Sequence, residues 1–273
     1  MKQLITEIAS NKEMTGGFYR MRLKSAYLAG KSLPGQFIEV RCSDGYDTLL
    51  RRPFGVHRVV KGGIEILYEV VGRGTDLLSR KKIGDSLDVI GPLGRGFKLA
   101  PAKGAAIIVA GGNGVAPLLA LVERLVHGKR KNIFVLIGAK NKNHILCRDE
   151  FKKLGAKVMI STEDGSDGRR GLITNCLSSL LSTMDCGPST IYACGPAGML
   201  KVVANIASRE HIPCQVSLEE RMACGVGVCL GCPVKIKTKH KIRATKYELR
   251  NTSYEYKMVC KDGPVFNAEE IAW

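Results

Sequence analysis

The sequence predicts a multidomain protein that combines a β domain with an α/β domain and ends in a small cysteine-rich segment. Short alternating runs fill the chain up to residue 98, continuous apolar runs alternate with helical patterns from Gly104 onward, and three cysteines fall within nine residues near the C-terminus. A chain of 273 residues is long enough for two domains and a small third. We place these units at residues 1–98, 99–213 and 214–273.

The first unit is predicted to be an antiparallel Greek-key β-barrel. Gly and Pro turns separate its strands at intervals that suit a small barrel, and Gly91–Gly96 punctuates its end. The predicted strands alternate between apolar and polar side chains, and they cover residues 17–23, 35–41, 63–71 and 86–90.

The second unit is predicted to be a Rossmann-like parallel α/β domain. Ala105–Ala110 is a continuous apolar run, as expected of a strand covered on both faces, and a glycine turn and a helical pattern from Pro117 to His127 follow it. Further strands are predicted at 133–137, 157–161 and 190–194, with a helix at 172–181. The glycine turn and Pro117 also argue against reading Gly104–Val122 as a membrane span.

Composition narrows the class of protein. The start, Met1–Glu7, carries an acid and has no long apolar run, so we expect no secretory leader and a cytoplasmic protein. In that compartment the ten cysteines are expected to be metal ligands or free thiols. The net charge of +17 fits a solvated basic surface, an acidic protein partner or, least well, nucleic acid. The short basic cluster Lys235–Arg243 has no interleaved aromatic residues for stacking on single-stranded nucleic acid.

Cys224, Cys229 and Cys232, with a distant Cys260, have the C-x4-C-x2-C…C spacing of plant-type [2Fe–2S] ligands. The glycines at 225, 227 and 231 allow a tight loop whose N–H groups approach the cluster sulfurs. A structural zinc site is the alternative, but zinc ribbons usually pair two C-x2-C motifs. The spacing therefore favours iron–sulfur in a small C-terminal domain.

Two glycine turns follow buried strands of the α/β unit. Gly111–Pro117 lies between a strand and a helix, where a dinucleotide pyrophosphate would rest, although it is not G-x-G-x-x-G. Cys194–Met199 repeats the layout after the last strand, and two such turns converge on one crevice. Alternatively, the glycine turns only allow strand and helix to pack, and Cys194 is a buried small side chain. The pair Glu163-Asp164, ahead of Gly165, could be no more than a surface turn.

The barrel unit offers weaker signals. Arg51-Arg52-Pro53-Phe54-Gly55 combines a fixed φ with a guanidinium able to hold phosphate, and Tyr68 could flank a ring system. A solvated arginine pair and a core tyrosine are the alternatives.

These motifs, in this order, resemble the ferredoxin–NADP reductase superfamily, and the appended cysteine segment is similar to that of the electron-transfer subunits of dihydroorotate dehydrogenase B. The resemblance covers nearly the whole chain. It implies FAD in the barrel, a nicotinamide nucleotide at the glycine turns and a [2Fe–2S] cluster on the four cysteines. The implied FAD ligands are Arg52, Pro53, Phe54, Gly55, Leu67, Tyr68, Glu69, Gly74 and Thr75. The implied nucleotide ligands are Gly111, Gly112, Asn113, Gly114, Pro117, Cys194, Gly195, Pro196 and Met199, and the implied cluster ligands are Cys224, Cys229, Cys232 and Cys260.

The resemblance also implies a function without a separate catalytic side chain, because the cofactors carry the redox chemistry. Electrons would pass from NADH through FAD and the cluster to an FMN-containing catalytic subunit. That subunit would be a separate chain, because this sequence contains no recognisable dihydroorotate site. The implied assembly is a heterotetramer of two copies of each subunit, in pyrimidine biosynthesis.

Two departures from the family pattern stand out. Family members usually have Ser or Thr where this chain has Gly55, so a side-chain hydrogen bond near the flavin is missing. The 27 residues between Cys232 and Cys260 form a longer interval than expected, and the excess around Thr238–Lys257 is basic and polar. Because long loops cost little closure entropy, Cys260 can still be a ligand, and the loop could face the partner subunit.

The sequence also allows other nucleotides and other functions. Lys140 and Lys142 follow the second α/β strand and suit the 2′-phosphate of NADPH, whereas the resemblance implies NADH. A subunit of an NADPH–ferredoxin oxidoreductase, a sulfide dehydrogenase or another diaphorase module has the same layout, though often with Asp at the position of Cys224. A zinc-stabilised, basic nucleic-acid-binding protein would explain the charge and the cysteines but not the two glycine turns.

Overall fold

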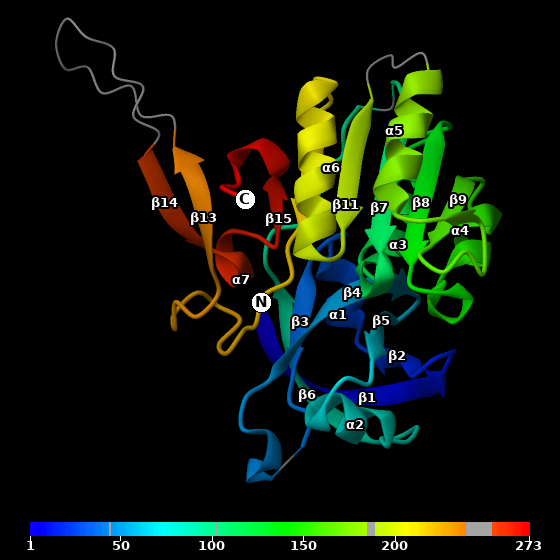
Figure 1. Ribbon diagram of the computed structural model, residues 1–273. Helices are drawn as coiled ribbons and strands as arrows, with labels where there is room; N and C mark the ends of the chain where they lie inside the picture. Colours follow the sequence, from blue (N-terminus) through cyan, green and yellow to red (C-terminus); the bar gives the residue numbers. More distant parts are fainter. Residues whose placement is uncertain (44, 102, 185–188, 239–252) are drawn as a thin grey trace, which may run out of the picture.

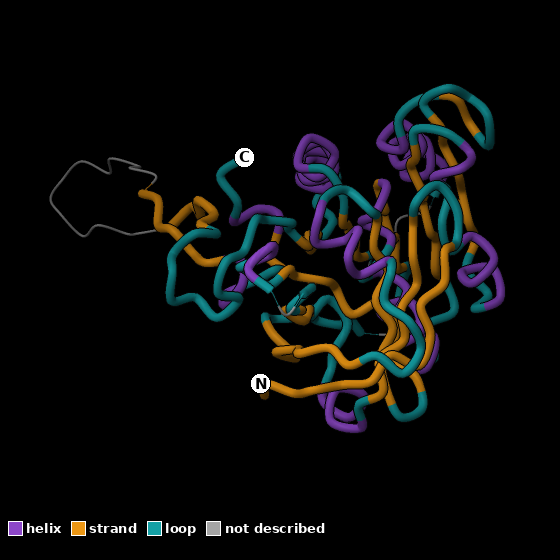
Figure 2. Tube along the Cα trace, turned by 90° about the horizontal axis from the view of Figure 1, so that it is seen from below, coloured by secondary structure: helices purple, strands orange, loops and turns teal. Residues whose placement is uncertain are grey.

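The structure is a computed structural model that describes residues 1–43, 45–101, 103–184, 189–238 and 253–273. Figure 1 shows a barrel below a larger sheet, with helices on both faces of that sheet and a two-stranded hairpin at one side. Seen from below in Figure 2, the hairpin again lies at one edge of the molecule. None of the described helices is long and apolar enough to cross a membrane.

The first unit is a closed antiparallel barrel, as predicted, with strand order β1-β2-β5-β4-β3-β6. The four predicted strands are present, and β1 and β4 complete the barrel. Its interior is filled by alternate apolar side chains, including Met21, Ile38 and Ile66, none of which is exposed. The elements are β1 (Lys2–Glu13), β2 (Phe18–Lys24), α1 (Ala26–Lys31), β3 (Phe37–Val40), η1 (Tyr46–Thr48), β4 (Arg52–Val60), β5 (Gly63–Glu69), α2 (Arg73–Ser79) and β6 (Ser86–Leu93).

The second unit is a seven-stranded sheet with the order β10-β9-β8-β7-β11-β12-β15. All neighbouring strands are parallel except β12 and β15. The predicted buried strand is β7, whose six residues are all buried. The elements up to Arg209 are β7 (Ala106–Gly111), η2 (Gly112–Val115), α3 (Leu118–His127), β8 (Ile133–Ala139), η3 (Lys142–His144), α4 (Arg148–Lys153), β9 (Lys157–Thr162), β10 (Arg169–Arg170), α5 (Ile173–Thr183), β11 (Thr190–Cys194) and α6 (Ala197–Arg209).

The C-terminal segment is partly built into this sheet, because β12 follows α6 as a parallel strand and β15 pairs with it. The cluster loop, residues 224–232, lies between β12 and the hairpin β13–β14. The remaining elements are β12 (Cys214–Ser217), β13 (Pro233–Thr238), β14 (Ser253–Met258), α7 (Val259–Asp262), β15 (Val265–Asn267) and η4 (Ala268–Glu270). The division at residue 214 stays a prediction, and residues 239–252 of the predicted long interval lie outside the described residues.

The barrel and the α/β unit meet along a seam of polar contacts. Arg20 on β2 pairs with Glu150 on α4 at 2.6 Å, and Arg58 on β4 pairs with Glu123 on α3 at 2.6 Å. Between them, the fully buried His57 ring places Nδ1 2.7 Å from the carbonyl oxygen of Ala116. Because a carbonyl only accepts, Nδ1 carries the proton. These contacts hold the end of the first glycine turn against the barrel.

Candidate functional site

Three cavities meet at Asn113, in the crevice between the barrel and the carboxyl ends of the parallel strands. The α/β cavity has a volume of about 360 Å³ and is lined by Gly111, Gly112 and Met199 among others. The barrel cavity, about 480 Å³, is lined by Arg52, Gly74 and Thr75, and the junction cavity, about 260 Å³, by Gly55, Pro117 and Glu219. Asn113 lines all three, so the three cavities adjoin at this residue.

The two glycine turns pack directly against each other in the wall of the α/β cavity. A methyl group on Gly114 would lie 2.2 Å from the carbonyl oxygen of Cys194, and one on Gly195 would lie 3.0 Å from the backbone of Gly111. Both turns therefore need glycine for close approach, as predicted by the packing alternative, and they also leave backbone exposed to a ligand. Gly111, Gly112, Pro196 and Met199 line the cavity, whereas Gly114, Cys194 and Gly195 form the packed layer behind it.

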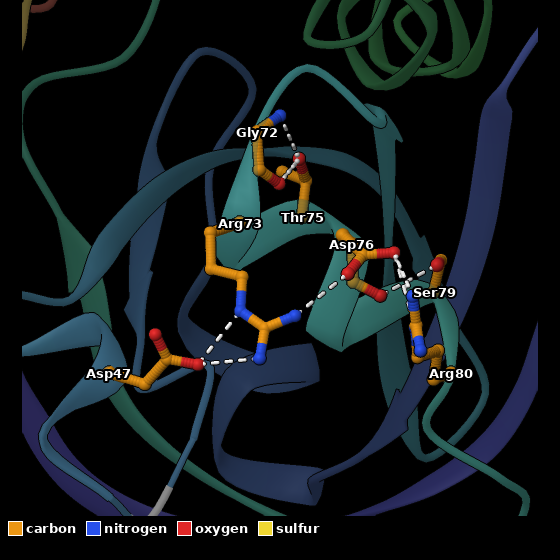
Figure 3. A network of polar contacts seen from close by, with 7 residues as sticks. All are labelled: Asp47, Gly72, Arg73, Thr75, Asp76, Ser79 and Arg80. Carbon is orange, nitrogen blue, oxygen red and sulfur yellow. Dashed lines mark hydrogen bonds and ion pairs between the residues drawn. The ribbon is translucent and has the colours of Figure 1, made fainter.

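Arg52 and the first turn of α2 form one wall of the barrel cavity. A methyl group on Gly74 would lie 3.4 Å from Nε of Arg52, so the guanidinium crosses the start of the helix. Thr75 Oγ1 accepts from the N–H groups of Val71 and Gly72 at 3.0 and 3.2 Å. Arg73 is anchored by Asp47 at 2.7 Å and by Asp76 at 3.3 Å (Figure 3). The wall therefore offers the Arg52 guanidinium beside the start of a helix, a cation that suits a diphosphate.

Other predicted barrel residues divide between cavity wall and core. Pro53 and Phe54 line both the barrel and the junction cavities, and Glu69 lines the barrel and the α/β cavities. Leu67 lines the junction cavity. Tyr68 is only 1% exposed, donates its hydroxyl hydrogen to Asn11 at 3.0 Å and contacts Phe54 edge to face, so most of it belongs to the barrel core.

Glu219 is a site residue that the sequence analysis did not single out. It follows β12 and lines both the junction and the barrel cavities, with its Oε1 3.9 Å from the Sγ of buried Cys194. Burial raises the pKa of Glu219 and also that of Cys194. No sequence pattern marks this carboxyl, because only the pairing of β12 with β11 brings it to the crevice.

Lys140 and Glu163 lie side by side at the far end of the α/β cavity. They follow β8 and β9, whose last residues pair in register, and both line the cavity. Asp164 points elsewhere, accepting from the backbone N–H and the hydroxyl of Ser166 at 2.9 and 2.7 Å. Asp164 therefore fits the predicted surface turn, whereas Glu163 lines the cavity and offers an acceptor to a ligand there.

The four cysteines predicted as cluster ligands come together as two pairs. The Cys224 and Cys229 side chains interact, as do those of Cys232 and Cys260, and Cys224 is also close enough to affect the pKa of Cys260. Backbone N–H groups also point at the sulfurs: those of Val226 and Cys229 lie 3.4 and 3.5 Å from Cys224 Sγ. The N–H of Cys260 lies 3.4 Å from Cys232 Sγ.

The loop backbone affects the ionisation of Cys224. Burial alone would raise its pKa, but the N–H groups of Cys229 and Val226 stabilise the thiolate and lower the pKa to about 6. Burial and the neighbouring Cys232 raise the pKa of Cys260 to about 12. Metal ligands must be deprotonated, and the loop backbone therefore favours the ligand form of Cys224.

The pairing fits two irons better than one metal ion. A single tetrahedral ion needs four ligands around one point, but the described residues contain no group of three or more His, Cys, Asp or Glu so placed. A [2Fe–2S] cluster takes two protein ligands at each iron. The donor set of two cysteine pairs, surrounded by backbone N–H groups, therefore fits a [2Fe–2S] cluster.

Comparisons with known proteins agree with this geometry. Residues 219–272 match the iron-sulfur cluster binding domain of dihydroorotate dehydrogenase B, and residues 108–205 match an oxidoreductase NAD-binding domain. The chain is 38% identical over 257 residues to the dihydroorotate dehydrogenase B (NAD(+)) electron transfer subunit of Desulforamulus reducens, covering 93% of this chain and 92% of that one. The chain belongs to this family. The same subunit of Caldanaerobacter subterraneus is 37% identical, covering 97% and 96% of the two chains.

Solved structures place this electron transfer subunit within a known fold. The structure of an NADH-dependent reduced ferredoxin-NADP oxidoreductase is similar with a TM-score of 0.82 and 28% identity, covering 98% of this chain and 90% of that one. A ferredoxin NADP+ reductase from Neisseria gonorrhoeae, solved with FAD and NADP bound, has a TM-score of 0.65 over 77% of this chain at 16% identity. The predicted ferredoxin–NADP reductase-like architecture is confirmed.

Proposed function

We propose that this subunit carries electrons between NAD(H) and an FMN-containing dihydroorotate dehydrogenase catalytic subunit, through FAD and a [2Fe–2S] cluster. Electrons released by dihydroorotate oxidation reach NAD+ along this path, and NADH can supply electrons to the same path in reverse. When bound, the nicotinamide and the flavin exchange a hydride, and the flavin and the cluster exchange single electrons. The chain's own residues bind and orient these groups.

The proposed binding sites follow the three cavities. Arg52, Gly74 and Thr75 would hold the flavin diphosphate, with the flavin ring extending towards Phe54 and Gly55 at the junction cavity. The glycine turns would hold the nicotinamide nucleotide, with Glu163 at the ribose of its adenosine half. The four cysteines would hold the cluster. In this proposal residues 1–98 form the FAD unit, 99–213 the nucleotide unit and 214–273 the cluster unit.

One observation carries the proposed electron path. The junction cavity is lined from the barrel by Phe54 and Gly55, from the first glycine turn by Asn113 and Pro117, and from the cluster segment by Met222. The three parts of the chain that would hold the three cofactors therefore share one small cavity. Such proximity is what stepwise electron transfer requires.

The partner is proposed from the family. The relatives are named as electron transfer subunits of dihydroorotate dehydrogenase B, which implies a separate catalytic subunit. We propose that this partner contains FMN and that two copies of each subunit assemble into a heterotetramer. Within the cluster loop, Val228 and Leu230 are 79% and 65% exposed, and we propose that the catalytic subunit covers them in the complex.

The test is the visible absorption spectrum of anaerobically purified protein before and after adding NADH. Flavin bands with broad iron–sulfur absorption that NADH bleaches are expected. Bleaching by NADPH but not by NADH would move the function to a ferredoxin-linked sister reductase. A colourless protein that contains zinc would overturn the proposal.

A further inference from the structure

Glu39 is a buried acid that the proposed function does not use. Its side chain is 0% exposed, and neither carboxyl oxygen has a hydrogen-bond partner among the described residues. Burying a carboxyl group without a partner costs several kcal/mol if it is charged, and less if it is neutral. A group this costly to bury calls for an explanation, such as a ligand that satisfies it.

Glu39 lies between the flavin side of the barrel and the cluster loop. It is on β3, where it pairs with Pro53 on β4, the strand that begins the proposed flavin site. On its other side it packs against Gly225, next to the ligand Cys224: a methyl group on Gly225 would lie 2.5 Å from Cγ and 2.9 Å from Oε1 of Glu39. Gly225 has φ +68° and no room for a side chain, so the loop backbone rests on the carboxyl group.

Burial favours the neutral form of Glu39, although two nearby arginines oppose it. Arg51 is the main nearby cation, but its guanidinium is bound to Asp88 at 2.5 Å. Arg52 donates to the carbonyl oxygens of Leu50 and Arg51 at 2.7 and 3.2 Å. Burial raises the pKa of Glu39 to about 8. A cluster held by four thiolates adds negative charge on the side of Cys224, which disfavours the carboxylate further.

A neutral carboxylic acid has one hydrogen to donate, and the cluster loop presents acceptors. Cluster and thiolate sulfurs accept hydrogen bonds, and such bonds raise the reduction potential because they stabilise the more negative reduced state. We propose that Glu39 donates a hydrogen bond to sulfur on the Cys224 side of the [2Fe–2S] cluster and thereby raises its potential. This inference rests on the proposed function, since it needs the cluster.

The experiment measures the cluster's midpoint potential by redox titration of the complete protein, followed through the electron paramagnetic resonance signal of the reduced cluster. Glu39→Leu removes the donor at similar volume and should lower the one-electron reduction equilibrium constant at least tenfold, which corresponds to 59 mV. Glu39→Gln keeps an N–H donor and should stay closer to the unchanged protein than Glu39→Leu does.

Glu65→Gln is the matched control, because Glu65 on β5 of the same barrel also has a buried carboxyl oxygen without a hydrogen-bond partner among the described residues. It should leave the potential unchanged. An unchanged potential in Glu39→Leu would overturn the inference, and a raised one would show that Glu39 is an ionised carboxylate instead. A reduced protein without any cluster signal would instead contradict the proposed function.

If Glu39→Leu does not fold, Glu39→Gln and infrared difference spectroscopy between oxidised and reduced protein provide an independent test. A protonated carboxyl band that shifts on cluster reduction and is missing in Glu39→Gln is expected. No such band in the unchanged protein would overturn the inference.

Discussion

At the scale of single residues, tertiary packing determines which acidic side chains lie beside the proposed cofactor sites. Glu219, Glu39 and Glu163 are all acids without a marked sequence motif, yet each lies at a different part of the cofactor path. Their surroundings give them different tasks. Glu163 is solvent-exposed and remains available to a hydroxyl group, Glu39 is fully buried, and Glu219 lines the crevice, where desolvation raises its pKa.

The position of Glu163 in the α/β cavity predicts that the protein prefers NADH to NADPH. A carboxylate there would accept a hydrogen bond from the ribose 2′-hydroxyl of NADH and repel a 2′-phosphate. We expect Glu163→Ala to weaken NADH binding about tenfold, since a hydrogen bond to a charged group contributes roughly 1.5–3 kcal/mol. It should weaken NADPH binding less or strengthen it. Steady-state KM values for both nucleotides measure this.

The neighbouring Lys140→Ala is the control for Glu163, because both side chains line the same cavity. It should change NADH binding less than Glu163→Ala does. A larger loss of NADH binding in Lys140→Ala, with Glu163→Ala neutral, would contradict the assignment.

At the scale of elements, strand order and a hairpin bring together the residues of the nucleotide site and of the cluster site. The two glycine turns are adjacent because β7 and β11 are neighbouring parallel strands, which end at the same edge of the sheet. The hairpin β13–β14 connects the third cysteine of the cluster loop to the fourth, since Pro233 follows Cys232 and α7 contains Cys260. Each element therefore determines the geometry of one cofactor site.

Gly114→Ala should damage the nucleotide site selectively. The added methyl group would meet backbone atoms of Cys194 and Gly195 at 2.2 to 2.6 Å, and backbone cannot rotate away as a side chain can. Overpacking of this kind costs roughly 1–3 kcal/mol. We expect slower flavin reduction by NADH with flavin and cluster content unchanged. Gly30→Ala, whose methyl group meets nothing within 4 Å, should behave like the unchanged protein.

Shortening the hairpin tests the predicted role of the long interval. Thr238 and Ser253 pair in register, and Thr238 Oγ1 donates to the Ser253 carbonyl at 2.7 Å, so a short turn can replace residues 239–252. We expect an intact cluster spectrum but weaker assembly with the catalytic subunit. Analytical ultracentrifugation of the mixed subunits measures the assembly constant. An unchanged constant would refute a role of the long interval in binding the catalytic subunit.

At the scale of the whole molecule, the barrel and the α/β unit are joined by charged and polar contacts around His57. Burial lowers the pKa of His57 to about 4, below the value near 6.5 of an unfolded histidine. Between these values the unfolded chain binds a proton that the folded chain does not. Stability is therefore fully present above pH 6.5 and decreases as the pH falls towards 4.

This linkage predicts the pH dependence of unfolding. We expect His57 to account for about 3 kcal/mol of stability lost between pH 6.5 and pH 4, at 1.36 kcal/mol per pKa unit. His57→Gln should flatten the dependence of the urea midpoint on pH in this window, whereas the exposed His127→Gln should not. Equal slopes in all three proteins would show that His57 is not the titrating group.

The sequence by itself determined the order of the units and much of the local chemistry. Alternation predicted four barrel strands, the apolar run predicted β7, and cysteine spacing predicted the cluster ligands, because these signals depend on neighbours within one loop or element. It did not mark β1 or β4 as strands, and it left Arg52 and Tyr68 undecided between site and core.

Only the tertiary structure decided which distant residues share the crevice. Glu219 reaches it through β12, and Glu39 meets Gly225, which lies 186 positions later in the chain. A charged residue within a strand reads locally as solvent-facing, yet all four residues of β3 are buried because the cluster loop covers its outer face at Glu39. Burial is a property of what packs against a residue, and local sequence does not encode that partner.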